Sequence, residues 1–429
     1  MSRLRFCFLT TFYPPYSFGG DAIAIQRLAH GLARVGHQVT VVHDVDAYAA
    51  LARSAAVTGP PEPPGVEVVP LRSGAGRFSP LLTQQFGRPV LNGSRIARIL
   101  SEGEFEVTNF HNISLIGGPG LLKYGRGLKV YMAHEHWLVC PTHVLWRHGR
   151  EPCTGRQCFR CQLMYRRPPQ LWRWTGVLER HLEQIDVFIA MSEFSRAKHR
   201  EFGFRRDMEV LPAFLPIAGD EEPAASDVSR PHGRPYFLFV GRLERIKGLQ
   251  EIIPLFHEYH QADLLVAGEG EYGRDLRALA AGMERVHFVG RVPAKDLARY
   301  YRHAIALVVP TLGFETFGLV LLEAFRQATP VIARRVGPFP EIVEHSGGGE
   351  LFSTREELLT AMRRLQDDPH HRGHLGASGH RAFLERWSED VVVPRYLELI
   401  NAARERRRQA SPVEMLAPRS VSGGFGERA

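Results

Sequence analysis

Two carboxylates, eight residues apart, flank a glycine-bearing turn in the second half of the chain. Glu315 precedes the turn, and Glu323 lies inside a helix that we predict to begin near residue 317. The unpaired N–H groups at a helix start form a natural anion site, and here they would belong to Phe317, Gly318 and Leu319. Such a layout can hold a sugar on one side of a diphosphate and a ribose on the other. The alternative is an ordinary strand–loop–helix unit with a solvated glutamate.

A second glycine-bearing turn carries two cations. It follows an apolar strand expected at Tyr236–Val240, and Gly241 allows the chain to turn tightly. Arg242 and Lys247 are placed to neutralise a diphosphate without a divalent ion. The alternative is an ordinary basic turn. The nearby loop Gly268–Gly270 is a weak signal, because glycine is common at strand ends.

Two features in the first half could also meet a ligand. Gly19 and Gly20 lie where the first strand meets the first helix, so backbone there can approach a phosphate closely; the alternative is a loop that needs a positive φ. His134 follows a strand, at the edge where α/β sheets bind ligands, although a lone histidine is more often structural. Together with Glu135 and His136 it resembles a metal pair, but alternate residues at a strand end usually point apart.

Four of the five cysteines fall in one window of the sequence. Cys140, Cys153, Cys158 and Cys161 form a four-thiol set, and the last two have metal-ligand spacing. Cys7 lies in the first predicted strand and is expected to be a buried thiol. In a reducing compartment a structural zinc is the favoured interpretation. Disulfides, an iron–sulfur cluster and unligated thiols remain alternatives.

Short apolar strands alternate with amphipathic helices along both halves of the chain. This alternation predicts two doubly wound α/β domains with parallel sheets, facing each other across a cleft. Strands are expected at Arg5–Thr10, Gln38–His43, Val66–Pro70, Val107–Phe110, Val130–Ala133, Val187–Ala190, Tyr236–Val240, Leu264–Ala267, Val286–Val289, Ala304–Val309 and Pro330–Ala333.

The Pro-rich, acidic stretch between the two strand series predicts an interdomain linker. The expected organisation is a first domain over residues 1–212 with a Cys-rich insertion at 137–175, a linker at 213–235, a second domain at 236–387, a crossover helix at 388–410 and a disordered tail at 411–429.

Composition excludes several classes of protein. The chain has 429 residues, 44% hydrophobic and 23% charged, which is typical of globular domains, and its longest apolar runs are too short to span a bilayer. The N-terminal apolar stretch is also too short for a signal peptide, so we expect a cytoplasmic protein. The formal net charge of +8 permits an anionic partner, but no nucleic-acid-binding motif is present.

Arginine and tryptophan alternate after the last cysteine. The segment Leu163–Trp174 contains Arg166, Arg167 and Arg173 with two tryptophans. This composition suits peripheral contact with an anionic membrane at its inner face, or a lipid-linked acceptor. The alternative is a helix start whose tryptophans pack inward.

In their order along residues 4 to 400, these motifs resemble the retaining glycosyltransferases of the GT-B fold, family 4 (group 1), and a subset of them with a Cys-rich insertion. The resemblance implies that Arg242 and Lys247 hold the diphosphate of a UDP- or GDP-sugar, and that Glu323 binds its ribose. Glu315 would contact the transferred sugar as an orienting group, and His134 would meet the same sugar. It further implies that Gly19 and Gly20 close over the diphosphate, aided by the amides of Phe317, Gly318 and Leu319.

The same resemblance implies transfer of a hexose to a glycan, lipid-linked or small-molecule acceptor with retention of anomeric configuration, and no catalytic metal. Two alternatives stay open: a nucleotide-sugar epimerase or hydrolase of similar fold, and a non-enzymatic, metal-stapled binding protein. The presence of Arg242, Lys247, Glu315 and Glu323 favours an active transferase.

Overall fold

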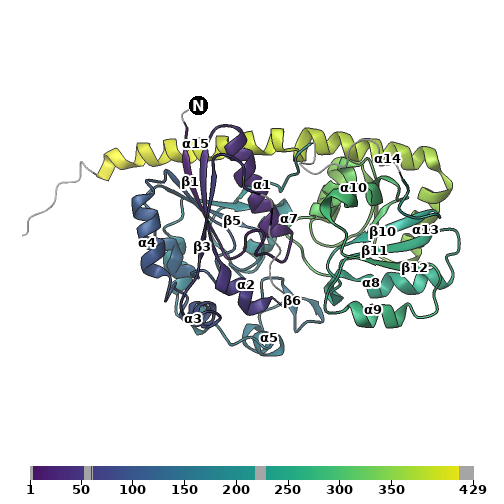
Figure 1. The fold of residues 1–429 in the computed structure, drawn as a ribbon, viewed down its shortest axis with the longest axis horizontal. Coiled ribbons are helices and arrows are strands. Elements are labelled where there is room, and N and C mark those ends of the chain that lie inside the picture. Colours follow the sequence, from purple (N-terminus) through teal and green to yellow (C-terminus); the bar gives the residue numbers. More distant parts are fainter. Residues whose placement is uncertain (1–2, 53–58, 60, 218–228, 415–429) are drawn as a thin grey trace, which may run out of the picture.

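The computed structural model describes residues 3–52, 59, 61–217 and 229–414. Two α/β domains lie side by side, and along one edge the helix α14 (Pro369–Ala382) lies on the second domain and the long C-terminal helix α15 (Glu389–Glu414) on the first (Figure 1). In the described part of the chain, the first domain has a seven-stranded sheet in the order β3-β2-β1-β4-β5-β8-β9, and the second a six-stranded sheet in the order β12-β11-β10-β13-β14-β15. All strand pairs within these two sheets are parallel, as the alternation of strands and helices predicts.

The first domain contains the following elements: β1 (Arg5–Thr10), α1 (Gly20–Arg34), β2 (Gln38–Asp44), α2 (Val45–Leu51), β3 (Val66–Leu71), α3 (Phe78–Phe86), α4 (Gly93–Glu102), β4 (Val107–Phe110), η1 (Pro119–Lys123), β5 (Leu128–Ala133), β6 (Trp146–Arg147), β7 (Glu151–Pro152), α5 (Cys158–Met164), η2 (Leu171–Trp174), α6 (Val177–Leu182), β8 (Val187–Ala190), α7 (Glu193–Glu201) and β9 (Glu209–Val210).

The second domain and the crossover contain β10 (Tyr236–Val240), η3 (Arg245–Lys247), α8 (Leu249–Ile252), η4 (Ile253–His257), β11 (Asp263–Ala267), α9 (Gly273–Leu279), β12 (Val286–Gly290), α10 (Ala294–Arg302), β13 (Leu307–Val309), α11 (Leu319–Arg326), β14 (Val331–Arg334), α12 (Phe339–Ser346), β15 (Gly349–Phe352), α13 (Arg355–Asp367), α14 (Pro369–Ala382), the π-helical turn η5 (Phe383–Trp387) and α15 (Glu389–Glu414).

In both sheets the first strand is central. The chain adds two strands on one side of it and then crosses over to add the remaining strands on the other side, so the strand order reverses there. The strands that flank this reversal are β1 with β4 in the first domain and β10 with β13 in the second. In open α/β sheets, ligands bind beyond the carboxyl ends of such strands. Their loops carry the Gly19, Gly241 and Glu315 regions, so the fold brings the predicted motifs to ligand-binding edges.

Helix α1 shows how the local sequence builds this frame. Its apolar residues recur at helical spacing, and the face with Ile25, Leu28 and Leu32 is buried in the core. The chain turns at Gly36, whose φ of +93° is a left-handed conformation that glycine adopts without strain. The central strand β1 is buried along most of its length, which is why it reads as one apolar run.

The chain passes between the domains twice, and the two passages lie beside each other. Leu215 N–H donates to the Trp387 carbonyl at 3.1 Å, and Glu389 N–H donates to the Leu215 carbonyl at 3.0 Å. Helix α15 then packs on the first domain, where Asn109 Nδ2 donates to Tyr396 Oη at 3.0 Å. The crossover helix is therefore part of the first domain's core.

Helix α15 extends to Glu414, past residue 411, where we expected a disordered tail to begin. Residues 415–429 of that expected tail lie outside the described residues, as do residues 218–228 of the expected linker. Within the described residues, no helix combines the length and the apolar character that crossing a membrane requires.

Candidate functional site

The loops after β10 and β13 pack against each other and are joined by a backbone hydrogen bond in the second domain. Leu312 N–H donates to the Ile246 carbonyl at 2.8 Å. Gly248 has a φ of +76°, and a β-carbon there would lie 2.1 Å from the Pro310 carbonyl oxygen. Only glycine allows this approach of the two backbones. The two motifs found separately in the sequence thus form one structural unit.

The packing of these two loops pairs Lys247 with Glu315. The Lys247 Nζ lies 2.5 Å from Glu315 Oε1, and both side chains are partly exposed. A cation and a carboxylate on adjoining loops offer one group for a phosphate and one for the hydroxyls of a sugar. The structure therefore brings together two residues that the sequence places 68 positions apart.

Helix α11 begins at Leu319, two residues later than the expected start near Phe317, because Gly318 takes the N-cap position with φ −151° and ψ 71°. Among the described residues, the N–H groups of Phe317, Gly318 and Leu319 have no backbone acceptor outside the helix, and no side chain caps the helix start. The three N–H groups that the sequence predicts to form an anion site thus remain uncapped by the described residues despite the shift in helix boundary.

The Gly19–Gly20 turn approaches this helix start from the other domain. Gly19 is extended, with a φ of −156°, so the alternative of a loop that needs a positive φ is wrong. A β-carbon on Gly20 would instead lie 3.1 Å from Leu319 Cδ1. This close approach between the domains places the turn beside the start of α11, and a larger residue at position 20 would require the Leu319 side chain to shift.

Arg242 lies on the first turn after β10 and is exposed, paired with Glu244 at 3.0 Å. The loop behind it is held by Gly268, where a β-carbon would lie 1.9 Å from the Gly241 carbonyl oxygen. Leu243 N–H also donates to the Glu269 carbonyl at 2.9 Å. The weak glycine signal at 268–270 therefore has a structural role, supporting the turn that carries Arg242.

Glu323 lies on α11 and is held from behind by a buried tyrosine. Tyr301 Oη on α10 donates to Glu323 Oε2 at 2.8 Å, and burial keeps the pKa of Tyr301 above its usual range, so the hydroxyl retains its proton. Among the described residues, Glu323 Oε1 has no hydrogen-bond partner. One carboxylate oxygen is thus fixed and the other can accept from a ligand hydroxyl.

His134 contacts both the core of the first domain and the Glu315 loop. Its Nε2 lies 2.9 Å from His111 Nδ1. Burial lowers the pKa of both rings, so both are neutral and one ring N–H forms the hydrogen bond between them. The His134 carbonyl accepts from Thr316 Oγ1 at 2.7 Å. The two residues that follow point elsewhere, since Glu135 pairs with His143 at 2.7 Å and His136 packs on His199.

Sequence reasoning missed a set of contacts that hold the domains together. Ser192 Oγ donates to the Thr316 carbonyl at 2.7 Å. The N–H groups of Glu193 and Phe194, at the start of α7, each donate at 3.1 Å to the carboxylate of Glu341 on α12. Ser192 also caps α7, because its hydroxyl oxygen accepts from Ser195 N–H at 3.0 Å. Glu341 gave no signal, because its partners belong to the other domain.

The expectation of a metal-free donor site also overlooked one acidic pair, Asp44-Val45-Asp46, which has the spacing of an Asp-x-Asp metal motif. Asp44 caps α2, accepting from Ala47 N–H at 3.0 Å, and burial raises its pKa to about 7. Asp46 accepts from the N–H and the hydroxyl of Ser73, both at 2.7 Å. Both carboxylates are therefore engaged in holding local structure.

Two protein-family models match most of the chain. The family model for glycosyltransferase family 4 matches residues 18–218, and the model for glycosyl transferases group 1 matches residues 220–381. The chain belongs to the family 4 glycosyltransferases.

A D-inositol 3-phosphate glycosyltransferase of Pseudarthrobacter chlorophenolicus is 31% identical over 46% of this chain and 51% of its own length. The chain spans about half the length of the first curated relatives that it matches, from 45% to 66%. A phosphatidyl-myo-inositol mannosyltransferase of Mycolicibacterium smegmatis is 24% identical over 91% of this chain and 93% of its own length.

The solved structure of Anabaena HepE in complex with UDP-glucose superimposes with a TM-score of 0.65 at 18% identity. It covers 93% of this chain and 100% of HepE. The two facing parallel-sheet domains of this chain thus form the GT-B fold.

In this chain the four clustered cysteines lie together at one small cavity. Cys140, Cys153, Cys158 and Cys161 all line it, and all are free thiols. The disulfide alternative therefore finds no support in the structure. Cys7 is fully buried in β1, as expected.

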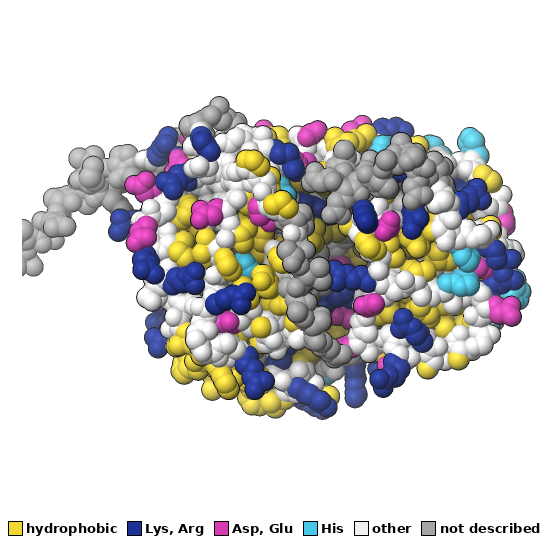
Figure 2. All heavy atoms as spheres, viewed as in Figure 1, with side chains coloured by type: hydrophobic (Ala, Val, Ile, Leu, Met, Phe, Trp, Pro, Cys, Tyr) yellow, Lys and Arg dark blue, Asp and Glu magenta, His cyan; other side chains and the backbone are white. Residues whose placement is uncertain are grey.

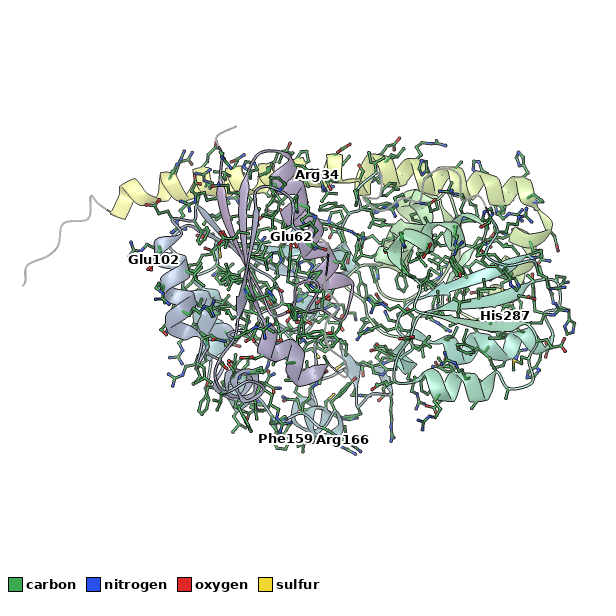
Figure 3. The ribbon with its side chains drawn as sticks, viewed as in Figure 1. Arg34, Glu62, Glu102, Phe159, Arg166 and His287 are labelled. Carbon is green, nitrogen blue, oxygen red and sulfur yellow. The ribbon has the colours of Figure 1, made fainter. Side chains whose placement is uncertain are left out.

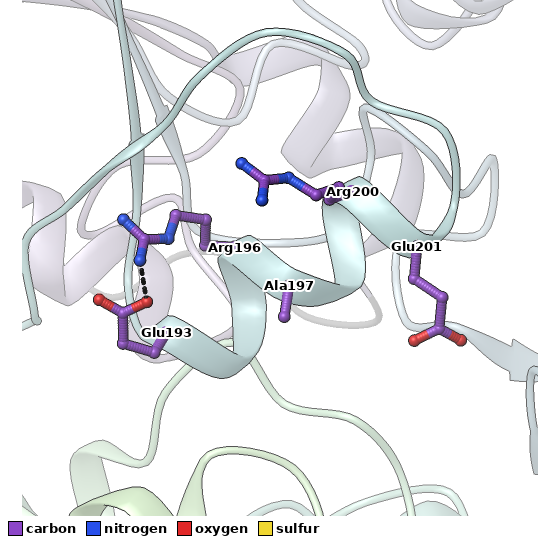
Figure 4. A pocket seen from close by; sticks show the side chains of 5 residues that line it. All are labelled: Glu193, Arg196, Ala197, Arg200 and Glu201. Atoms are coloured by element: carbon purple, nitrogen blue, oxygen red, sulfur yellow. Dashed lines mark ion pairs between the residues drawn. The ribbon is translucent and has the colours of Figure 1, made fainter.

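A larger hollow lies along α7, lined by Glu193, Arg196, Ala197, Arg200 and Glu201 (Figure 4). Glu193 and Arg196 form an ion pair across it. None of the residues expected to bind the donor line this hollow, so its size does not mark the site of chemistry.

Proposed function

We propose that this glycosyltransferase transfers a hexose from a UDP- or GDP-sugar to a lipid-linked or glycan acceptor, with retention of anomeric configuration. One observation carries the proposal: the Lys247–Glu315 pair, the uncapped start of α11 and Gly20 of the other domain converge at one place. An anion site flanked by a carboxylate on each side fits a nucleotide sugar. The HepE structure contains UDP-glucose on the same fold, which supports a nucleotide-sugar donor.

Each residue has a part in this proposal. Lys247 and Arg242 attract the diphosphate, and the free N–H groups at the start of α11 donate to it. Glu323, oriented by Tyr301, accepts from the ribose hydroxyls through its free oxygen. Glu315 contacts the transferred sugar from the loop that Lys247 holds.

In the reaction the bond between the anomeric carbon and the phosphate oxygen breaks, and a bond forms from that carbon to the acceptor oxygen. The acceptor's proton passes to the departing phosphate on the same face of the sugar. The leaving diphosphate gains negative charge, which the two cations and the helix start stabilise electrostatically. Glu315 orients the sugar and stabilises the positive charge that develops on it.

The acceptor side carries an apolar face edged with arginine. Exposed side chains from α3, α5 and η2 form this face: Phe78, Leu81, Phe86, Phe159, Leu163, Met164, Leu171 and Trp174. Figure 2 shows hydrophobic side chains gathered where Figure 1 places α3 and α5, and Figure 3 shows Phe159 and Arg166 side by side at that edge. The exposed arginines at this face are Arg77, Arg88, Arg160, Arg166 and Arg167.

The parts of this face form one continuous surface. Trp172 Nε1 on η2 donates to the Gln84 carbonyl of α3 at 2.8 Å, and the rings of Phe159 and Trp174 lie 6.3 Å apart. Large exposed apolar patches mark interaction sites, and interleaved arginine favours an anionic lipid surface. We therefore propose peripheral contact with an anionic membrane, which suits a lipid-linked acceptor. The Mycolicibacterium relative is named for a phosphatidyl-inositol acceptor.

The membrane contact is tested by sedimentation with vesicles of phosphatidylglycerol or phosphatidylcholine. We expect binding to the anionic vesicles, strongly reduced in a Phe159→Ser, Trp174→Ser variant. Leu279→Ser, which changes an exposed leucine of the second domain, is the matched control and should bind normally. Equal binding to both vesicle types, or equal binding by both variants, would contradict the proposal.

The transfer itself is tested by incubating the protein with UDP- and GDP-hexoses, with and without lipid or glycan acceptors. We expect an acceptor-dependent product whose new bond, by NMR, keeps the anomeric configuration of the donor. Free sugar or an epimerised donor as the main product in every mixture would favour the hydrolase or epimerase alternative instead.

A further inference from the structure

We propose that Cys140, Cys153, Cys158 and Cys161 bind one zinc ion, which fixes the Cys-rich insertion at residues 137–175 against the loop that carries Glu315. The metal site itself is independent of the proposed transfer reaction. Only its consequence for the cleft rests on that function.

The four cysteines converge from three separate segments. Cys140 lies in the turn after His136, Cys153 directly follows β7, and Cys158 and Cys161 lie one turn apart on α5. All four side chains line a cavity of about 20 Å³. A space of this size accommodates one water-sized occupant, and therefore a single ion. Four thiols around one such space match the ligand set of structural zinc sites.

Polar groups already contact two of the sulfurs. The backbone N–H of His148 donates to Cys161 Sγ at 3.3 Å, and Cys140 Sγ lies 3.3 Å from Thr142 Oγ1. Outer groups of this kind orient ligands and stabilise thiolates at metal sites.

A partly buried arginine, Arg173, supplies positive charge that would offset the negative charge of ionised cysteines. Arg173 stacks on Trp137 and Trp172 and donates to Gln170 and to a backbone carbonyl, but among the described residues it forms no ion pair with a carboxylate. Burial lowers the pKa of Arg173 to about 10, and negative charge at the sulfurs of Cys140 and Cys158 opposes that lowering, which places both sulfurs within its electrostatic reach. Zinc with four thiolates carries a net charge of −2, so a cation here stabilises it.

The sulfurs must draw together when the ion binds. Within the described residues, no three of the cysteine sulfurs lie within 4.8 Å of one another. The one trio of histidine, cysteine or acidic ligand atoms that does so is His232, Asp263 and His287. Tetrahedral zinc with Zn–S bonds of about 2.3 Å sets the sulfurs about 3.8 Å apart. Metal binding is therefore expected to contract the cysteine cavity.

The His232–Asp263–His287 trio does not compete as a metal site. Asp263 also pairs with Arg234 at 3.1 Å and Arg285 at 3.4 Å, so two positive charges already face its carboxylate. A further cation would be repelled there. This trio is an ion-pair network at the start of the second domain's strands, whereas the cysteine cavity offers thiols without such competition.

The Cys-rich insertion, which the zinc would fix, contacts the candidate site. Phe314 packs against the buried cluster formed by Cys140, Leu145 and Phe202. A β-carbon on Gly313 would lie 3.5 Å from Trp146. Because Gly313 and Phe314 directly precede Glu315, the position of the sugar-facing loop depends on the shape of the cysteine-bearing segment.

The test uses the full chain, expressed with added zinc and purified without chelator. We expect one zinc per chain by elemental analysis. Replacement by cobalt should give thiolate charge-transfer bands and tetrahedral d–d bands. Cys158→Ser and Cys161→Ser should lose the metal, whereas the matched control Cys7→Ala, which changes a cysteine in β1, should keep it.

A second measurement follows the wild-type protein before and after a chelator removes the metal. We expect a lower melting temperature and faster protease cleavage within residues 137–175, both restored by zinc. Metal-free protein with four titratable thiols, a disulfide by mass spectrometry, or iron with inorganic sulfide would overturn the proposal. Donor binding, measured separately, distinguishes failure of the zinc site from failure of the proposed transfer function.

Discussion

Tyr301→Phe tests whether Glu323 must be held in place to bind the donor. The change removes one hydroxyl, which donates to Glu323 Oε2 at 2.8 Å from a side chain that is 1% exposed. A hydrogen bond to a charged group contributes about 1.5–3 kcal/mol. Because Glu323 is partly exposed, water replaces some of that bond. We expect donor binding to weaken by about 1 kcal/mol, which is about five-fold in Kd.

Tyr236→Phe is the matched control. Tyr236 is equally buried in the same domain, and its hydroxyl donates to the Tyr300 carbonyl, also at 2.8 Å. Both variants should lose similar stability in denaturant titrations. Donor affinity, measured by isothermal titration calorimetry, should fall only in Tyr301→Phe. An equal change in donor Kd for both variants, or none for either, would refute the role assigned to Tyr301.

Other changes separate the roles of the remaining groups. Glu323→Ala should raise the donor Kd at least ten-fold, the loss expected for a charge-assisted hydrogen bond, whereas Glu315→Ala should mainly lower kcat; equal small effects on both constants would contradict this division. Gly248→Ala should lower the free energy of unfolding by about 2 kcal/mol or more in denaturant titrations, since it adds a left-handed strain and a clash with the Pro310 carbonyl. Burial raises the pKa of Asp44 to about 7, so the folded state holds a proton that the unfolded state has lost. Wild-type stability should therefore fall, relative to Asp44→Asn, as pH rises from about 4 to 7; parallel pH profiles would show that Asp44 does not titrate in this range.

The sequence predicted the framework of both sheets well. Buried parallel strands read as short, continuous apolar runs, and for this reason β1, β4, β8 and β10 have the expected bounds. Strand β15, Gly349–Phe352, was missed because its residues are mostly partly exposed and lack such a run.

The site was predicted in part. The motifs with Lys247 and Glu315 were visible because their chemistry and spacing are local, but their pairing depends on how two loops pack. Tyr301, Thr316 and Glu341 gave no signal, since a residue that acts through a partner on another element leaves no periodic pattern. Their roles required the fold.

The central claim is that Arg242, Lys247 and the start of α11 hold the diphosphate of a nucleotide sugar. Calorimetric titration of UDP- and GDP-sugars into the wild-type protein and an Arg242→Ala, Lys247→Ala variant tests it most directly. We predict that one donor class binds the wild type and that the variant binds it at least about 100-fold more weakly, since two charge-assisted contacts are lost. Undiminished affinity in the variant would contradict the claim.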